Sequence, residues 1–441
     1  MRRVCLLISL VALLTPAMGR TIPDGILDDV LGDFFNREDE NITWLPPSIN
    51  LSDYKKGWWE RFRHRFNESF IEEEWKNWTK KWEEKFQNLS EKVKRLWRNA
   101  TRNFEKAKMN HSFIGGMEYE NGYCIGNFVK FLYDEGDIVD YTILREDNIT
   151  VFDFVRIEGF SPTEEPSVHG AVWRVKGADA EIEVHDNPLA LLKIKTKTNA
   201  TIEFNLANDI HAEKYENITN IIRIHGEIDG RIIMVAKGEA EISNESVRIS
   251  LKSPGSVLFM VDPLPDVSVN IQSQVFHEER ISRYIGNRKI GARLLLQFNN
   301  SDEMIFSDMN VSCKVMKGRI KVVVNATGEG KAIILDVRND VLNISKEIVV
   351  KIDNQSIQIA KSFEEVVNFS SEDPAKYYIL NGTNGLQIVV CIPRFSTHTI
   401  DIIESEVTSV EAEEKETPGP GMALLAISIM LVALLVRRFR K

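Results

Sequence analysis

Cysteine is scarce in this sequence, which has four cysteines among 441 residues. Cys5 falls in an N-terminal segment that we expect to be removed, so Cys124, Cys313 and Cys391 remain. An odd number of cysteines allows one disulfide and one spare thiol, and it excludes a small fold that depends on disulfides. Because Cys313 and Cys391 lie in the same β-rich half of the chain, we expect the disulfide to join them.

Motifs that carry catalysis or bind cofactors are also missing. The chain has no His-Glu-x-x-His and no Gly-x-Ser-x-Gly, and Gly328-Glu329-Gly330-Lys331 lacks the spacing of a phosphate loop. The eight histidines are scattered without the spacing of zinc ligands. We therefore expect no cofactor, no metal and no enzyme activity. An acidic segment over residues 134–140 indicates a solvated turn, with a calcium site as the alternative.

Positive charge is in deficit, with 55 Lys and Arg against 65 Asp and Glu and a net charge of −10. This balance argues against binding to nucleic acid. The remaining composition, 43% hydrophobic and 27% charged, is ordinary for a globular protein. A chain of this length has room for two or three domains.

The N-terminus reads as a secretory signal peptide over residues 1–19. Arg2 and Arg3 form a short basic region, an apolar run follows over 4–14, and Ala17-Met18-Gly19 supplies small residues for cleavage. We interpret residues 20–57, which include Pro46-Pro47, as an extended leader.

The C-terminus reads as a membrane anchor. Residues 404–421 form an acidic stalk that ends in Pro and Gly, and residues 422–441 combine the uncharged run 422–436 with a basic tail. The basic tail belongs on the cytoplasmic side of a membrane. We therefore expect a transmembrane helix, with the body of the protein at the extracellular face.

This C-terminal tail resembles the PGF-CTERM sorting signal of archaeal surface proteins. The resemblance covers Pro418-Gly419-Pro420-Gly421, the apolar run and the basic end, although Pro420 stands where that family has Phe. It implies an archaeal origin and processing by an archaeosortase, which replaces the helix with a lipid anchor. Whether the helix is kept or replaced stays open at this point.

Acceptor sites for N-glycosylation, Asn-x-Ser/Thr, are far more frequent than chance. They account for 18 of 31 asparagines, whereas the Ser and Thr content predicts roughly 3. Because glycans are bulky and hydrophilic, these asparagines must face solvent. The sites are Asn41, Asn50, Asn67, Asn77, Asn88, Asn99, Asn110, Asn148, Asn199, Asn217, Asn244, Asn299, Asn310, Asn325, Asn343, Asn354, Asn368 and Asn381.

Residues 58–110, which follow the leader, contain no Pro. Their pattern predicts a long amphipathic helix. Three blocks of eleven residues align without gaps over 75–85, 86–96 and 97–107. Position 3 of each block is a glycosylation site, and positions 1, 4 and 8 are apolar. Because eleven residues make almost three helical turns, the apolar positions form one seam. The seam consists of Trp75, Trp78, Trp82, Phe86, Leu89, Val93, Trp97, Ala100 and Phe104.

Three partners for this seam stay open. The helix packs on the chain's own β-rich body, pairs with copies of itself, or lies on a membrane surface, where Trp is favoured.

From about residue 113 the texture changes to short β-branched runs separated by turn signals. We expect a mainly β body of antiparallel sandwich-like domains, with a β-solenoid as the alternative. Pro263-Leu264-Pro265 divides the body into β-rich domains over 113–265 and 266–403. Asp229-Gly230 and Asp353-Asn354 predict hairpin turns.

The sequence therefore predicts a membrane-anchored, N-glycosylated extracellular protein with a structural or interaction role, such as a surface-layer component, stalk or adhesin. Its partners would be the membrane, glycans and copies of itself through the helix. The alternative is a surface-tethered module that binds or hydrolyses carbohydrate or peptide.

Overall fold

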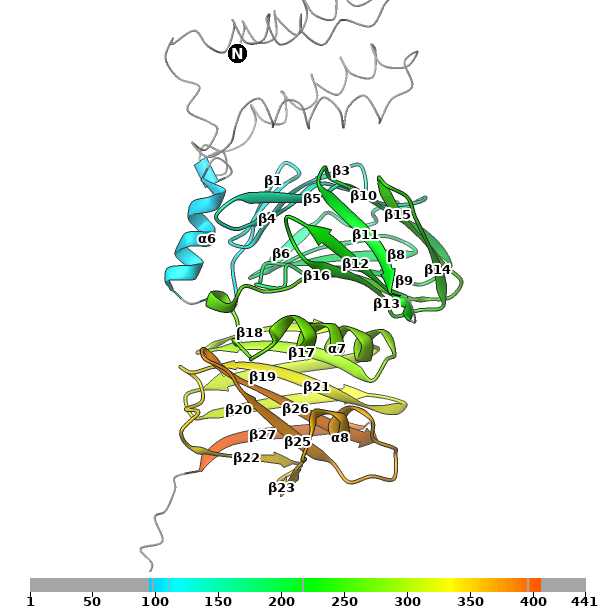
Figure 1. Ribbon diagram of the computed structural model, residues 1–441. Helices are drawn as coiled ribbons and strands as arrows, with labels where there is room; N and C mark the ends of the chain where they lie inside the picture. The colour runs from blue at the N-terminus through cyan, green and yellow to red at the C-terminus, as the bar shows by residue number, and fades with distance from the viewer. Residues whose placement is uncertain (1–94, 97–98, 111, 216–217, 395, 406–441) are drawn as a thin grey trace, which may run out of the picture.

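The structure is a computed structural model that describes residues 95–96, 99–110, 112–215, 218–394 and 396–405. These residues form two β units stacked one on the other, with a helix at their junction (Figure 1). The helices in this part of the chain are α6 (Ala100–Met109), η1 (Pro265–Val267), α7 (Gln274–Gly286) and α8 (Phe363–Val367).

The upper unit consists of two eight-stranded sheets. Sheet 1 has the order β1 (Glu118–Glu120), β2 (Tyr123–Ile125), β3 (Val129–Asp134), β4 (Asp137–Leu144), β5 (Asn148–Ile157), β10 (Ala200–Leu206), β15 (Ser246–Leu251) and β14 (Gly238–Ile242). Sheet 2 has the order β11 (Ile210–Tyr215), β12 (Ile218–Gly226), β13 (Gly230–Met234), β16 (Gly255–Val261), β9 (Leu192–Thr196), β8 (Ala180–His185), β7 (Val172–Lys176) and β6 (Ser167–His169). Every strand pairing in these two sheets is antiparallel.

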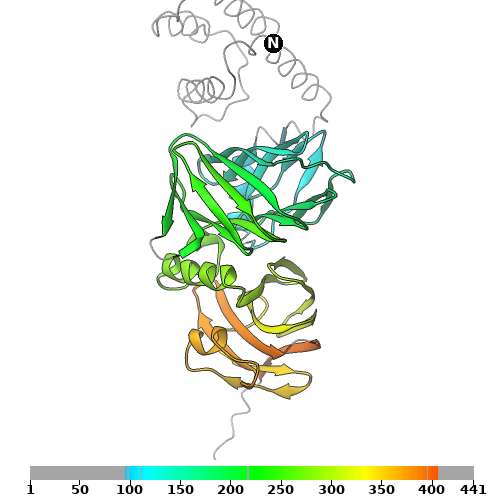
Figure 2. The same ribbon diagram turned by 90° about the vertical axis from the view of Figure 1, so that its right-hand side faces the viewer.

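The lower unit consists of a six-stranded and a five-stranded sheet. Sheet 3 has the order β18 (Asn300–Ile305), β17 (Ile290–Gln297), β21 (Glu329–Arg338), β26 (Gly385–Arg394), β25 (Lys376–Asn381) and β24 (Gln358–Ile359). Sheet 4 has the order β19 (Met309–Met316), β20 (Arg319–Ala326), β27 (Thr397–Ser405), β22 (Glu347–Ile352) and β23 (Gln355–Ser356). The turned view in Figure 2 shows the same stacking of the two units.

Three apolar layers hold the stack together. One layer lies between sheets 1 and 2, a second between sheet 2 and sheet 3 together with α7 and α8, and a third between sheets 3 and 4. Strand β16 shows how one strand serves two layers: Val257 and Phe259 face the first, and Leu258 and Met260 face the second. This alternation follows from the two-residue repeat of a strand.

The two inner sheets are therefore buried on both faces, and their sequences show it. Strands β13, β17 and β26 are almost continuously buried, whereas β15 and β20 alternate between buried and exposed residues. Continuous apolar runs are expected of strands covered on both sides, and alternation is expected of strands with one wet face. The burial pattern thus separates inner sheets from outer sheets.

The prediction of a mainly β body is confirmed. The strands form two pairs of facing sheets, so the solenoid alternative is wrong. Sheet 3 also departs from a purely antiparallel arrangement, because β17 pairs in parallel with β21 and β24 with β25. The chain leaves sheet 3 after β18, forms β19 and β20 in sheet 4, and returns beside β17.

The turn predictions have different outcomes. Asp353 and Asn354 form a two-residue turn between β22 and β23, with φ of 51° and 67°. Positive φ at both central residues is the mark of the type I′ hairpin. Asp229 and Gly230 lie in a hairpin as predicted, but the closing pair Ile224–Gly230 encloses a longer loop.

The expected disulfide between Cys313 and Cys391 is not formed, and all three described cysteines are free. Cys391 belongs to the layer between the two units, whereas Cys313 packs against the layer between sheets 3 and 4. The two side chains thus lie on opposite sides of sheet 3. The sequence could not show this, because it indicated only that both cysteines lie in the same β-rich half of the chain.

Several predicted segments lie outside the described residues: the signal peptide 1–19, the leader 20–57, the helix before residue 95, the stalk from 406 to 421 and the anchor 422–441. Within the described residues, none of the helices is long and apolar enough to span a bilayer. The stalk was expected to begin at residue 404, but Glu404 and Ser405 complete β27, where Glu404 pairs with Lys346 at 2.8 Å.

Candidate functional site

The glycosylation sites are the largest group of predicted functional residues that the structure describes. It covers twelve of them; Asn41, Asn50, Asn67, Asn77, Asn88 and Asn217 lie outside the described residues. Ten of the twelve are exposed and two, Asn99 and Asn148, are half-buried. Of the twelve described asparagines outside such motifs, only five are exposed, and Asn103 and Asn187 are buried. The motif therefore coincides with accessible asparagines.

Seven of the described sites belong to the lower unit, and they mark one sheet face and several turns. Asn310 and Asn325 are direct cross-strand neighbours on the outer face of sheet 4. Asn299 lies in the β17–β18 turn with a φ of 59°, and Asn354 in the β22–β23 turn. Asn368 and Asn381 lie at the ends of α8 and β25, and Asn343 lies in the loop between β21 and β22. Solvent can reach every one of these seven positions.

Two glycosylation sites of the upper unit meet beside α6. The Thr101 hydroxyl, which completes the motif of Asn99, donates to Asn148 Oδ1 at 3.2 Å. Asn99 lies at the start of α6, and its Nδ2 donates to the carbonyl of Arg95 at 2.8 Å. Sequence reasoning placed Asn99 and Asn148 in different domains, and the tertiary structure brings them together.

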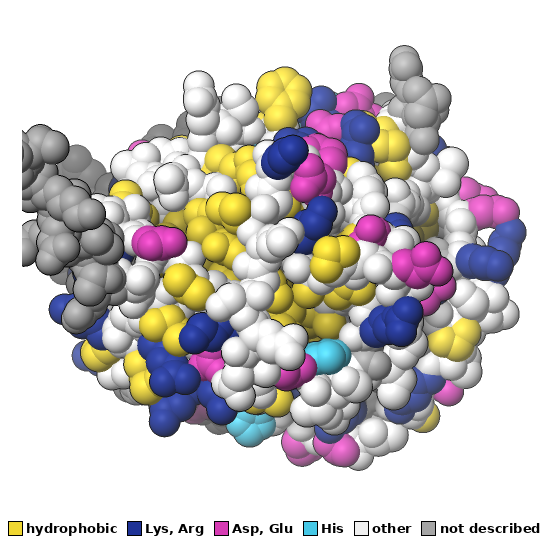
Figure 3. Space-filling model, turned by 90° about the horizontal axis from the view of Figure 1, so that it is seen from below, with side chains coloured by type: hydrophobic (Ala, Val, Ile, Leu, Met, Phe, Trp, Pro, Cys, Tyr) yellow, Lys and Arg dark blue, Asp and Glu magenta, His cyan; other side chains and the backbone are white. Residues whose placement is uncertain are grey.

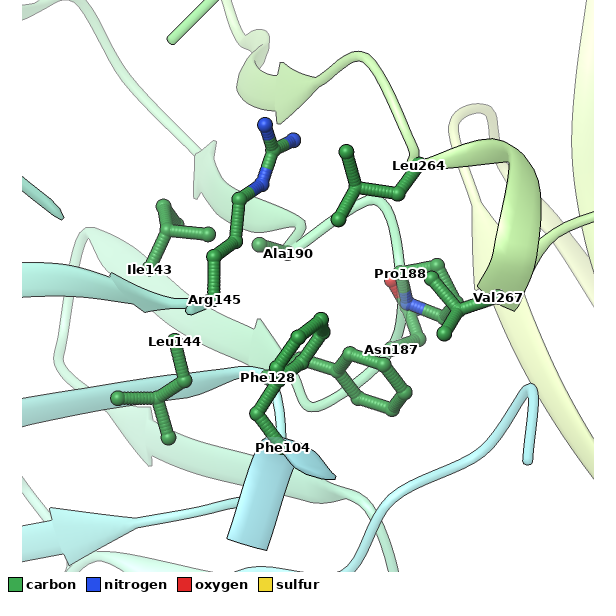
Figure 4. A pocket seen from close by; sticks show the side chains of 10 residues that line it. All are labelled: Phe104, Phe128, Ile143, Leu144, Arg145, Asn187, Pro188, Ala190, Leu264 and Val267. Atoms are coloured by element: carbon green, nitrogen blue, oxygen red, sulfur yellow. The ribbon is translucent and has the colours of Figure 1, made fainter. Parts of the chain in front are cut away.

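Helix α6 contains the last part of the predicted seam, and it packs on the upper unit. Ala100 and Phe104, at positions 4 and 8 of the third block, are buried in the layer between sheets 1 and 2. The rings of Phe104 and Phe128 pack edge to face with their centroids 6.3 Å apart, and both side chains are seen in Figure 4. Packing on the chain's own β body is therefore confirmed for this block. The other seam residues, including Trp97, lie outside the described residues.

The crevice beside Phe104 is small. It is lined by α6, β4, η1 and the segment before β9 (Figure 4), and a second crevice lies between the units around Pro188 and Arg293. Each has room for about one water molecule, whereas ligand pockets enclose several hundred Å³. Neither crevice in the described part of the chain has the size of a substrate site.

A buried charged network lies in the layer between the units, and sequence reasoning missed it. Arg293 of β17 donates to both carboxylate oxygens of Glu278 at 2.6 and 2.9 Å and to Asp336 at 2.6 Å. Gln387 bridges Asp336 and His277 through bonds of 2.7 and 2.6 Å. Burial disfavours the charged form of Glu278, but Arg293 outweighs that effect and lowers the pKa of Glu278.

The two units also meet through polar side chains at the edge of sheet 3. His185 Nδ1 lies 2.7 Å from Asp302 Oδ1, and Asn187 donates to the other Asp302 oxygen at 2.7 Å. All three side chains are buried. Since unpaired buried polar groups are costly, this arrangement fixes how the units sit against each other. It is a structural junction and presents no open face to a substrate.

Asp186, between these two residues, anchors the loops of the upper unit. Its carboxylate accepts backbone N–H groups of Gly116, Asn127, Phe128 and Val129 at 2.6 to 3.2 Å. A Cβ at Gly126 would fall 2.2 Å from Asp186 Oδ1, so only glycine permits this approach.

Ser396, His398 and Asp353 form the arrangement closest to a catalytic one. Ser396 Oγ lies 3.2 Å from His398 Nε2, and His398 Nδ1 lies 2.7 Å from Asp353 Oδ2. However, His398 Nε2 also faces the carbonyl of Arg394 at 3.0 Å. Both ring nitrogens thus face acceptors, so neither is left to take a proton from Ser396. Neither crevice includes these residues, and a triad requires a cleft with oxyanion donors.

The acidic segment 134–140 forms the tight β3–β4 turn. Glu135 and Gly136 occupy its corner with φ of 51° and 98°, and Asp137 pairs with Arg156. In the part of the chain that the structure describes, no three His, Cys, Asp or Glu side chains converge as a metal ion requires.

The lower end of the molecule, seen in Figure 3, shows hydrophobic side chains near the centre of the view and charges of both signs around them.

Comparison with known proteins gives no family to set beside this geometry. No protein-family model and no curated protein sequence matches the chain.

Proposed function

We propose that this chain is a membrane-anchored, N-glycosylated protein of the extracellular cell surface that acts through structure and contact. A surface-layer component, a stalk or an adhesin fits this description, and the chain is not an enzyme. The signal peptide, the acidic stalk and the C-terminal anchor predicted from the sequence belong to the same proposal. So does the archaeal sorting tail, with the anchor either retained or replaced by lipid.

The observation that carries the proposal is the exposure of the glycosylation motifs. The motif is enriched about sixfold over chance, and none of the twelve described sites is buried. Placing the acceptor motif at accessible asparagines serves no purpose in a chain that is never exposed to the glycosylation machinery. The fold supports the role as well, because both inner sheets are used for packing, and the two crevices are too small for a substrate.

Glycopeptide mass spectrometry of the protein from its native host tests this proposal. We expect glycans on most of the ten exposed sites, including Asn310, Asn325 and Asn354. Asn121 and Asn287, which are exposed but lie outside such motifs, provide a matched control that should stay unmodified. Unmodified asparagines at most of the motifs would refute the glycoprotein assignment.

Attachment to the membrane is tested separately by truncation after Gly421. We expect the full chain to sediment with membranes and the truncated chain to appear in the medium. Intact-mass measurement of the C-terminal peptide distinguishes a retained helix from a lipid replacement. Equal membrane association of the two chains would contradict anchoring through residues 422–441.

A further inference from the structure

The outer face of sheet 1 has an apolar ladder that the sandwich core does not use. Tyr123, Leu132, Val139 and Phe154 are consecutive cross-strand partners on β2, β3, β4 and β5. Their neighbours along the strands, such as Cys124 and Phe131, point the other way into the core. The ladder therefore faces away from sheet 2.

The ladder is nevertheless shielded from water. Tyr123 is 1% exposed, Leu132 6%, and Val139 and Phe154 9% each. On a bare outer face, side chains of this size would be largely exposed. The next partner of Phe154 is Asn205 on β10, followed by Ser246 on β15, so the apolar stripe ends after β5. The shielded area is thus confined to four strands.

Leu96 indicates which part of the chain covers the ladder. It packs against the cluster of Tyr123, Ile125, Leu132 and Val139. Leu96 lies one helical turn before Ala100, where α6 begins, and it is the last residue of the second eleven-residue block. Figure 1 shows that the N-terminal end of α6 lies beside sheet 1.

The buried residues of α6 give the register of the contact. Ala100, Phe104 and Ala107 occupy positions 4, 8 and 11 of the third block. Leu96 occupies position 11 of the second block, where positions 4 and 8 are Leu89 and Val93. Because eleven residues are almost three turns, these three side chains continue the same face upstream.

The length and the charge of the segment that contains Leu89, Val93 and Leu96 also fit the ladder. Residues 89–96 in a helix extend about 11 Å, and four strands of a sheet extend about 14 Å from first to last. The segment also contains Lys92, Lys94 and Arg95 against the single Glu91. Asp134 of β3 and Asp137 and Asp140 of β4 lie on the hairpin beside the ladder, where Asp137 pairs with Arg156. Within the eight described strands of sheet 1, the one glycosylation site, Asn148, is the first residue of β5.

We propose that residues 86–96 of this chain dock as a helix on the apolar ladder of sheet 1, with Leu89, Val93 and Leu96 facing Tyr123, Leu132, Val139 and Phe154. The outer face of sheet 1 is then an intramolecular docking surface, which ties the glycan-bearing repeat to the β body. Asn88, at position 3, lies on the flank of that contact and keeps its glycan in solvent.

Hydrogen–deuterium exchange of the full chain, read by mass spectrometry, tests this docking. Val93→Lys places a charge in the contact, whereas Gln87→Lys adds the same charge about 150° around the helix from the centre of the face formed by Leu89, Val93 and Leu96. We expect exchange in residues 86–96 to accelerate about tenfold or more in Val93→Lys and to be unchanged in Gln87→Lys. Leu132→Lys should release the same segment from the side of the sheet.

Exchange in β9 and β16 shows whether the upper unit stays folded, and Val93→Lys keeps the test valid if Leu132→Lys does not fold. Equal exchange in Val93→Lys and Gln87→Lys, or unprotected 86–96 amides in the wild type, would overturn the proposal. Protection that rises with protein concentration would assign the surface to a second copy. Protection seen only with lipid vesicles would assign the segment to a membrane.

Discussion

The two outermost faces of the four-sheet stack differ in what they present. The outer face of sheet 4 has polar pairs beside a few half-buried apolar side chains: Asn310 and Asn325 are paired glycosylation sites, and Arg319 pairs with Asp401 at 2.8 Å. The outer face of sheet 1 has the apolar ladder that includes Leu132 and Val139, and the one glycosylation site within its described strands is Asn148, the first residue of β5. The same sandwich architecture thus presents acceptor motifs to solvent at one end and a shielded apolar face at the other.

This contrast teaches how an outer strand shows its environment. Strand β20 alternates strictly between buried and exposed or half-buried residues, as one wet face requires. Strand β3, also in an outer sheet, is buried at Phe131, Leu132 and Tyr133 in succession. Burial on both faces of an outer strand is evidence that something covers the sheet.

Moving a glycosylation site from one face to the other should have the largest effect. We expect Leu132→Asn with Asp134→Thr to destabilise the protein by about 2–4 kcal/mol, because it removes a buried Leu and places a glycan on the ladder. The matched change on sheet 4, Lys321→Asn with Val323→Thr, should cost less than about 1 kcal/mol. Thermal unfolding in a glycosylating host measures both.

The same variants made in a host without glycosylation separate the loss of Leu132 from the effect of the glycan. If the sheet 1 variant and the sheet 4 variant were equally destabilised in the glycosylating host, the proposed difference between the two outer faces would be wrong.

An intermediate effect is expected at Lys130, which lies on the outer face of sheet 1 next to the ladder. Burial lowers the pKa of Lys130 to about 8, and Asp140 opposes that shift. Because the folded protein binds this proton more weakly than the unfolded chain, the charge destabilises the fold below about pH 8, and this loss disappears as pH rises toward 10.5. We expect Lys130→Met to stabilise the protein by about 1–3 kcal/mol at pH 7.

Urea unfolding between pH 7 and 10 checks this prediction, with Lys321→Met on sheet 4 as the control. The advantage of Lys130→Met over the wild type should shrink as pH rises, and the control should show no such trend. A constant difference across the pH range would contradict the burial of Lys130.

The smallest effect is expected from removing the paired glycosylation sites of sheet 4. Asn310→Gln with Asn325→Gln keeps the polarity of an exposed face, so the free energy of unfolding should change by less than about 0.5 kcal/mol. Intact mass should fall by two glycans if both sites are occupied. A large loss of stability would mean that the glycans, or a partner on sheet 4, contribute to the fold.

Sequence reasoning succeeded where the signal is local. The spacing of Ala100 and Phe104 predicted their shared packing face, because helical periodicity depends on neighbouring residues alone. Asp353-Asn354 predicted its turn, because few residues tolerate positive φ. The exposed motifs at Asn325 and Asn354 agree with the requirement that an acceptor site face solvent.

It failed where the answer depends on which face of a sheet a residue takes. The Cys313–Cys391 pairing is wrong because Cys391 points into the layer between the units, away from sheet 4 and Cys313. The network of Arg293, Glu278 and Asp336 could not be predicted either, since charged residues in strands and helices are usually solvated. The role of Asp186 could not be predicted from the sequence, because its partners are backbone N–H groups of distant loops.

The sequence by itself determined the class of fold, the positions of the acceptor asparagines, the period of the helical repeat and the expected nature of both ends of the chain. Each of these depends on composition or on residues close together in the chain. Only the tertiary structure decided that four sheets stack, that two of them are buried on both faces, and that the outer face of sheet 1 differs from that of sheet 4. These properties arise from contacts between segments far apart in sequence, where the burial of apolar surface outweighs local preference.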